Sequence, residues 1–343
     1  MILSCLEKSE YERYTKEFDF TAFIKNKTFL ITGSGGMTGS AIVKWILYEN
    51  RVHNTNAKIY ASTRNPNNIP SYIEKNDNIE MCEFGKEEET IRDTDIDYII
   101  HAASPTERDF FVNYPAETFK IIINGTERML DLCKKKNAAF ILLSSVEVYG
   151  AIDSKEPIKE EVVGSIDSLN IRNGYSMGKK GAEFLVYSYF KEFNCNTMIA
   201  RISAIQGLYQ DYNEQRIFNE ITRCILENKN LVMKSTGMSK KSIVYTLDAV
   251  SGILTVLFKG IKGEVYNITN PETFVTMKEL VEEMFSTFNP KLEIEYDITS
   301  ESNTGYLPYL ALVQSIEKIS NLGWKPITNL KKIYEIDINR WKV

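Results

Sequence analysis

Tyr175 and Lys179 stand four residues apart, and their side chains can together move a proton on and off a reacting hydroxyl group. On a helix, this spacing places both side chains on one face, so that the ammonium lies near the phenol and favours its anion. A phenol with an ordinary pKa near ~10 then becomes usable as an acid or base near neutral pH. Tyrosine and lysine also share helix faces for packing and solubility alone. The pair therefore indicates an active site only in combination with other motifs of the chain.

Three glycines, Gly33, Gly36 and Gly39, form a second chemical signal. The run 29–32 before them is short and apolar, as in a buried parallel strand, and 41–47 after them has helical periodicity. Glycine permits the tight turn, the approach of the backbone to a pyrophosphate and close packing of helix on strand. The strand before and the helix after therefore predict dinucleotide binding, whereas a glycine turn without a ligand would leave Tyr175 and Lys179 unexplained.

Alternating strand and helix patterns predict the elements that position these residues. The expected strands are 28–32, 58–62, 80–84, 98–101, 140–144 and 197–202. This rhythm predicts an α/β fold, a Rossmann-type doubly wound parallel sheet with a smaller C-terminal α/β substrate lobe. The charged run 86–89 between two strands is interpreted as a solvated helix face.

The chain divides into three expected parts. Residues 1–26 are a charged, aromatic-containing prefix, interpreted as a helix or arm packed on the body. Residues 27–204 are the dinucleotide-binding domain with the catalytic residues. Residues 205–343 form mainly the substrate lobe, and the chain is expected to cross back to the Rossmann body around 242–269.

Composition excludes several classes of function. The formal net charge is -5 and the basic residues are dispersed, so no nucleic-acid or membrane partner is expected. The five cysteines lack paired spacing and only two histidines occur, which argues against a metal site and against a serine–histidine hydrolase. Charged residues occupy the place of a signal-peptide core, and no stretch reaches ~18 apolar residues, so we expect a cytoplasmic protein.

Six motifs in order resemble those of the extended short-chain dehydrogenase/reductase superfamily, of the NAD-dependent epimerase/dehydratase type that acts on nucleotide sugars. They are Thr32–Gly39, Asp97–Ala103, Asn124–Thr126, Ser144–Gly150, Tyr175–Lys179 and Leu322–Pro326. Within the superfamily the chain most resembles UDP-glucuronate decarboxylase, through His101–Pro105, Ser145–Tyr149 and Arg172.

The resemblance implies roles for individual residues. Tyr175 would exchange a proton with the sugar oxygen, Lys179 would hold the nicotinamide ribose and lower the pKa of Tyr175, and Ser145 would hydrogen-bond the reacting oxygen. For Ser145 alone, a hydroxyl bonding the backbone at a strand end would be the commoner case. The implied cofactor contacts are Gly33, Gly36, Met37, Gly39, Thr63, Arg64, Ala102, Ala103, Tyr175 and Lys179.

The implied substrate contacts are Ser104, Asn124, Glu147, Arg216 and Lys241. Glu147 matches a glutamate beside the sugar, where it either takes part in proton transfer or simply hydrogen-bonds a sugar hydroxyl. Val146 stands where a 4,6-dehydratase carries an aspartate acid, which disfavours dehydration. Arg216 is a candidate partner for the diphosphate, or else an exposed helix arginine.

Two departures from the decarboxylase pattern concern the substrate. Ala204 replaces an asparagine, and Lys241 replaces an arginine. A lysine attracts phosphate as a point charge, without the bidentate fork of arginine. The substrate is therefore expected to differ from UDP-glucuronate.

The end of the second strand bears on the cofactor. It lacks the acidic residue that holds the ribose hydroxyls of NAD, and offers Thr63 and Arg64, a hydroxyl and a guanidinium suited to a 2′-phosphate. This favours NADP(H) over NAD(H). Stacking of Arg64 on adenine would be compatible with either cofactor.

These departures favour an NADP(H)-dependent oxidoreductase that reduces a keto group of a nucleotide-activated sugar or nucleotide-linked ketose, in surface polysaccharide precursor synthesis. One alternative is a redox-neutral nucleotide-sugar decarboxylase or epimerase with bound NAD; another is a non-catalytic dinucleotide-binding protein, against which Ser145, Tyr175 and Lys179 argue. The resemblance also implies a homodimer, in which the helices carrying Asn124 and Tyr175 pair into a four-helix bundle. The apolar face for that pairing would be Phe184, Leu185, Tyr187 and Ser188.

Overall fold

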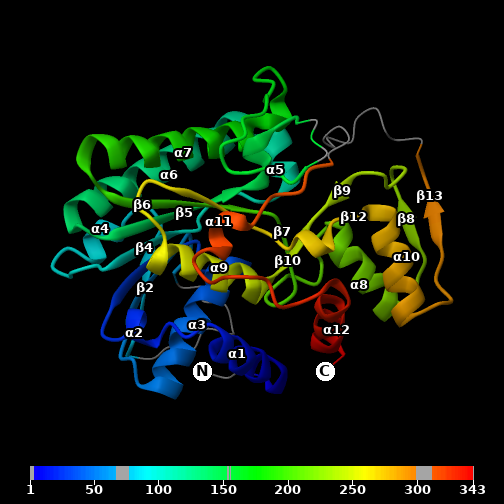
Figure 1. Cartoon of the computed structure of the whole chain (residues 1–343), viewed down its shortest axis with the longest axis horizontal. Helices are drawn as coiled ribbons and strands as arrows, with labels where there is room; N and C mark the ends of the chain where they lie inside the picture. The colour runs from blue at the N-terminus through cyan, green and yellow to red at the C-terminus, as the bar shows by residue number, and fades with distance from the viewer. Residues whose placement is uncertain (1–3, 67–76, 153, 155, 299–310, 343) are drawn as a thin grey trace.

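A seven-stranded parallel sheet forms the centre of the computed structural model, which describes residues 4–66, 77–152, 154, 156–298 and 311–342 (Figure 1). The strands lie in the order β11-β6-β5-β4-β1-β2-β3. Their bounds are β1 (Thr28–Thr32), β2 (Lys58–Thr63), β3 (Ile79–Glu83), β4 (Tyr98–His101), β5 (Ala139–Ser145), β6 (Asn196–Ile202) and β11 (Val265–Ile268). This confirms the predicted Rossmann-type sheet.

The strand order reverses beside β1. From β1 the chain builds outward through β2 to β3, then returns so that β4 pairs on the opposite side of β1, with Thr32 beside His101. In open α/β sheets such a reversal leaves a crevice at the carboxyl ends of the two central strands, where ligands bind. The sequence motifs that follow β1, β4 and β5 all meet at this edge.

Helices cover both faces of the sheet, because alternate strand residues point to opposite sides. Phe29 and Ile31 join one core with the helices α3 and α9, whereas Leu30 joins the other with α6 and α7. Figure 1 shows α6 and α7 on one side of the sheet and α1, α3 and α9 on the other. The bounds are α3 (Met37–His53), α4 (Glu87–Thr90), α5 (Arg108–Asn113), α6 (Pro115–Lys136), α7 (Gly174–Phe193) and α9 (Thr246–Lys259).

The N-terminal segment forms α1 (Cys5–Glu17) and the single turn α2 (Thr21–Ile24). A capping box between Ser4 and Glu7 starts α1, and Tyr11 and Tyr14 are fully buried. The Tyr11 hydroxyl donates to the Ala41 carbonyl of α3 at 3.1 Å. The hydroxyls of Tyr14 and Thr328 lie 2.6 Å apart. Helix α1 therefore contacts both α3 and the C-terminal part of the chain.

The C-terminal part forms a smaller lobe of short strand pairs and helices, on the right in Figure 1. Its elements are β7 (Ala204–Gln206), α8 (Ile217–Glu227), β8 (Leu231–Met233), β9 (Lys240–Lys241), β10 (Ile243–Tyr245), β12 (Val275–Thr276), α10 (Met277–Phe288), β13 (Ile294–Tyr296) and α12 (Leu330–Trp341). The single turn α11 (Glu317–Ser320) instead contacts β11 and α9 of the main body. Between these elements α9 and β11 return to the main body, where β11 pairs with β6. The chain therefore leaves the sheet for the lobe after β6, returns at α9 and leaves again after β11.

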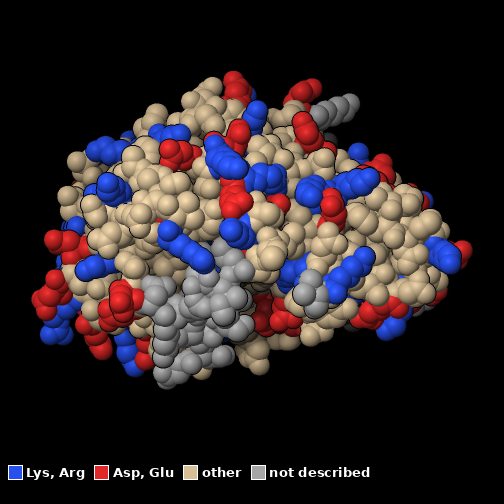
Figure 2. Space-filling model, turned by 90° about the horizontal axis from the view of Figure 1, so that it is seen from below, with Lys and Arg blue, Asp and Glu red and all other residues tan. Residues whose placement is uncertain are grey.

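The surface carries charges of both signs. Figure 2 shows acidic and basic side chains interspersed over one face of the molecule. Among the residues that the structure describes, no helix combines the length and apolar character needed to cross a membrane.

Candidate active site

The glycine turn after β1 is packed so tightly that side chains are excluded. Gly33 has φ +68°, and a Cβ there would lie 2.8 Å from backbone atoms of Ala102 and Ala103. A Cβ on Gly39 would lie 2.2 Å from the Gly33 carbonyl oxygen. Gly36 is the N-cap of α3 and no side chain caps the helix, whose first residue is Met37. The first amide groups of α3 are thus available to a phosphate anion.

A buried hydrogen-bond chain ties the end of β1 to the loop after β4. The Ala103 amide donates to Thr32 Oγ1 at 3.2 Å, and the same hydroxyl lies 2.8 Å from His101 Nδ1. Burial, together with the charges of Lys179 and Arg128, lowers the pKa of His101 to about 3. His101 is therefore neutral and structural, and it holds Ala102 and Ala103 against the glycine turn.

The end of β2 places Thr63 against the glycine turn, since a Cβ on Gly35 would lie 3.1 Å from Thr63 Oγ1. Arg64 follows it and is exposed. The sequence interpretation missed Glu87, which is buried rather than on a solvated face. Its carboxylate accepts hydrogen bonds from Ser62 Oγ at 2.6 Å and from the Gly85 amide at 2.9 Å. An acid thus lies beside β2, but these donors occupy both of its oxygens.

Ser145, Tyr175 and Lys179 come together at the carboxyl end of β5. Ser145 ends that strand, and Tyr175 and Lys179 lie one turn apart in α7. Ser145 lies close enough to Tyr175 to lower the pKa of its phenol. Lys179 Nζ donates to the Leu143 carbonyl at 2.7 Å and lies 5.9 Å from the centroid of the Tyr175 ring. The structure therefore assembles the three residues that the sequence selected.

The electrostatics of Tyr175 differ from the expectation. Burial raises the pKa of Tyr175, and the negative charge of Glu147 raises it further. Ser145, Arg172 and Arg216 act in the opposite direction and do not reverse the shift. Lys179 is not among the largest influences on this pKa, and its Nζ donates to the Leu143 carbonyl, so the lowering by Lys179 stays a prediction.

Glu147 lies beside this group in the 3-10 turn η1 (Val146–Tyr149). Arg172, in the 3-10 turn η2 (Ile171–Asn173), contacts both of its carboxylate oxygens, at 3.3 and 3.2 Å. Ser176 Oγ donates to Glu147 Oε2 at 2.9 Å. Sequence reasoning used Arg172 only as part of a resemblance and missed Ser176, although Ser176 directly follows Tyr175.

Two basic residues of the C-terminal lobe lie near the same group of side chains. Arg216 is the N-cap of α8 and forms an ion pair with Glu214 at 2.8 Å. Lys241 remains in contact with solvent, but desolvation by the surrounding protein lowers the pKa of its ammonium. Glu147 raises this pKa, whereas Arg172 and Arg216 lower it. These mutual effects indicate that the four charged side chains lie near one another and near Tyr175, at the edge of the sheet where open α/β folds have their ligand cleft.

The remaining predicted substrate contacts are placed differently. Ser104 follows β4, and its hydroxyl donates to the Pro105 carbonyl at 3.2 Å. Asn124 lies on the exposed face of α6, together with Lys120 and Glu127. Ile122 occupies the buried face of that helix, and the contact of Asn124 with the substrate stays a prediction.

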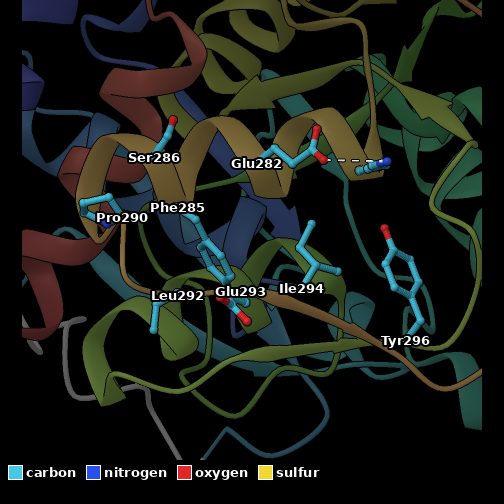
Figure 3. Close-up of a pocket in the computed structure, with 9 residues that line it drawn as sticks. Glu282, Phe285, Ser286, Pro290, Leu292, Glu293, Ile294 and Tyr296 are labelled. Carbon is cyan, nitrogen blue, oxygen red and sulfur yellow. Dashed lines mark ion pairs between the residues drawn. The ribbon is translucent and has the colours of Figure 1, made fainter.

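A separate hollow of about 450 Å³ lies between α10 and β13 (Figure 3). It is lined by Lys278, Glu282, Phe285, Ser286, Pro290, Leu292, Glu293, Ile294 and Tyr296. An ion pair between Lys278 and Glu282, at 3.7 Å, borders one side. None of the predicted site residues lines this hollow, so it is not the candidate active site.

The site is typical of a dinucleotide-dependent enzyme of the short-chain dehydrogenase/reductase type. It combines the strand order of the sheet, the glycine turn after β1 and the group formed by Ser145, Tyr175 and Lys179. Residues 29–269 match the NAD dependent epimerase/dehydratase family. The match covers most of the chain, and the protein belongs to this family.

Known proteins similar to the chain act on nucleotide sugars. It is 27% identical over 308 residues to UDP-glucuronic acid decarboxylase 5 of Arabidopsis thaliana, covering 90% of this chain and 87% of that one. It resembles the structure of dTDP-glucose 4,6-dehydratase from Bacillus anthracis with NAD, with a TM-score of 0.76, 22% identity and coverage of 92% and 96%. It also resembles UDP-glucose 4-epimerase from Thermotoga maritima with UDP-glucose, with a TM-score of 0.79, 19% identity and coverage of 92% and 98%.

Proposed function

We propose that this enzyme catalyses the redox-neutral decarboxylation of a nucleotide-linked uronic acid. The observation that carries the proposal is the Ser145–Tyr175 pair beside Glu147 and its partner Arg172. Relatives similar over nearly the full chain are decarboxylases of this kind. This replaces the net reduction that the sequence favoured, to which neither the cleft nor the relatives add support.

The chemistry requires oxidation of the sugar hydroxyl that is β to the carboxylate. A bound nicotinamide would accept the hydride and return it before product release. Tyr175 would take the hydroxyl proton, with Ser145 hydrogen-bonded to the same oxygen. The resulting β-keto acid loses carbon dioxide, because the electrons of the broken carbon–carbon bond pass into the carbonyl oxygen. Protonation of carbon and return of the hydride then give a pentose without net consumption of cofactor.

The cationic side of the cleft supports an anionic substrate. Lys241 and Arg216 come from different elements of the C-terminal lobe and both act on the region around Tyr175 or Glu147. Either a diphosphate or a uronic carboxylate would gain from such charges. We propose the diphosphate for Arg216, since an arginine at a helix N-terminus adds a guanidinium to free amide groups.

The proposal is tested by incubating the purified protein with UDP-glucuronate and other nucleotide-linked uronic acids. We expect one carbon dioxide per pentose product, measured by trapped gas and by proton NMR, with no net change in absorbance of the reduced nicotinamide. Product formation with stoichiometric loss of NADPH would contradict the proposal and favour the reductase.

The reductase remains a second candidate because of the end of β2. Arg64 is exposed, Thr63 supplies a hydroxyl, and Glu87 is engaged by Ser62 and the Gly85 amide. This arrangement suits the 2′-phosphate of NADP(H).

Replacing Arg64 with alanine is expected to weaken NADP(H) binding by about tenfold or more and NAD(H) binding by less than about threefold. Only the phosphate loses a charge-assisted partner in this variant. Titration calorimetry with both cofactors measures the difference, and Arg51→Ala on the exposed end of α3 is the control. An equal loss for both cofactors would instead indicate stacking of Arg64 on adenine.

We also propose that the enzyme is a homodimer. Phe184 and Tyr187 on α7 are 70% and 45% exposed, and Phe119 on α6 is 40% exposed. Leu185 and Ser188 of the predicted face are only partly exposed, and Ser188 donates to the Phe184 carbonyl. Light scattering at micromolar concentration should give twice the mass of one chain.

A further inference from the structure

The Glu147 carboxylate is surrounded by hydrogen-bond donors. Arg172 Nη2 donates to Oε1, and both Arg172 Nη1 and Ser176 Oγ donate to Oε2. The Arg172 and Glu147 side chains are 14% and 22% exposed, so water competes little for these bonds. A carboxyl group that accepts three hydrogen bonds on its two oxygens is held in one orientation.

Arg172 is itself held in place from two sides. Its amide donates to the Asn170 side chain at 3.0 Å, which starts the turn η2. Its guanidinium carbon lies 5.3 Å from the centroid of the Phe111 ring, and Phe111 stacks on Tyr175 with centroids 4.7 Å apart. A single packed group therefore connects Arg172 with the reacting phenol, through Phe111 on one side and Glu147 on the other.

The structure assigns Arg172 as a positioning residue that fixes Glu147 as a hydrogen-bond acceptor beside Tyr175. Glu147 is then not the proton donor of the reaction, and it acts by accepting a hydrogen bond from a sugar hydroxyl or a water. This assignment decides between the two roles that the sequence left open for Glu147. The reaction that this assignment refers to rests on the proposed function. The position of Glu147 does not, because it follows from the hydrogen bonds of the structure.

The charges around Tyr175 give the assignment a pH-dependent consequence. Glu147 from η1 raises the pKa of Tyr175, and Arg172 from η2 and Arg216 from α8 lower it. Ser145 from β5 lowers it by hydrogen bonding, and Lys179 of α7 is directed to a backbone carbonyl. Turnover that needs the Tyr175 phenolate therefore rises with pH. Glu147→Gln should move this rise to lower pH, whereas Arg172→Gln should move it to higher pH.

The test compares Arg172→Gln in the wild-type protein and in Glu147→Gln. In the wild-type background we expect kcat to fall by about tenfold to a hundredfold with less than about a threefold change in KM. In the Glu147→Gln background the same change should cost less than about threefold at the pH plateau, because the group that Arg172 positions is already altered. Arg172→Lys should restore part of the loss. Lys159→Gln, which removes the exposed ion pair with Glu317, is the control and should leave kcat unchanged.

Equal losses in both backgrounds, or a rise in KM alone, would overturn the assignment and indicate direct contact of Arg172 with the substrate. If the wild-type protein releases no carbon dioxide, the proposed function fails, and the same variants are compared in NADPH-dependent turnover. A crystal structure of Arg172→Gln gives a readout that needs no activity. The Glu147 carboxylate should leave hydrogen-bonding distance of Ser176, and an unchanged Glu147 would overturn the assignment.

Discussion

Replacing Tyr175 with phenylalanine is expected to lower turnover by ~10² or more while leaving the fold and dinucleotide affinity near those of the wild type. The change removes the hydroxyl that exchanges the proton, but it keeps the ring that stacks on Phe111. Steady-state kinetics, circular dichroism and cofactor titration measure the three properties. Tyr296→Phe, on the exposed strand β13 of the C-terminal lobe, is the control. Wild-type rates in Tyr175→Phe would remove Tyr175 from the reaction.

Replacing Lys179 with methionine is expected to lower turnover by about a hundredfold and also to weaken cofactor binding. Lys179 is only 3% exposed, its ammonium donates to the Leu143 carbonyl, and it lies next to the Tyr175 ring. The shape of methionine preserves the packing of the buried stem. Lys191→Met on the exposed end of α7 is the control.

The same variant has a distinct effect on stability. Burial lowers the pKa of Lys179 from 10.5 to about 8, with Glu183 opposing the shift. Between these values the unfolded chain binds more protons at this residue than the folded chain, so its contribution to the free energy of unfolding rises with pH. Lys179→Met should lose that rise in urea unfolding between pH 8 and pH 10. An unchanged slope would show that Lys179 is not buried as described.

The sheet and the glycine turn could be predicted because their signals are local. A β-branched run, three glycines and a helical period lie within 20 residues, and each is explained by the geometry of its own segment. The Tyr175–Lys179 spacing is local in the same way, and it holds because both residues lie in α7. The fold and the family predicted from these features are confirmed by the sheet order and by the family match.

Other parts of the site depend on contacts that no local pattern encodes. Arg172 bonds Glu147, and Ser62 bonds Glu87. In both pairs the partners are 25 residues apart in the sequence. The pKa of Tyr175 is raised by burial and by Glu147. Neither of these influences can be predicted from the Tyr175–Lys179 spacing. Asn124 is a different case, since a helical period in which Ile122 and Thr126 are buried already turns Asn124 toward solvent.

The N-terminal helix α1 has a consequence for how substrate enters the cleft. It bonds to α3 through Tyr11 and Ala41, and to the C-terminal lobe through the pairs Tyr11–Tyr209 and Tyr14–Thr328. Rotation of one lobe away from the other about a hinge would break these buried bonds together. We therefore expect access to the cleft through rearrangement of the loops around Arg216 and Lys241, with the two lobes moving as one rigid unit.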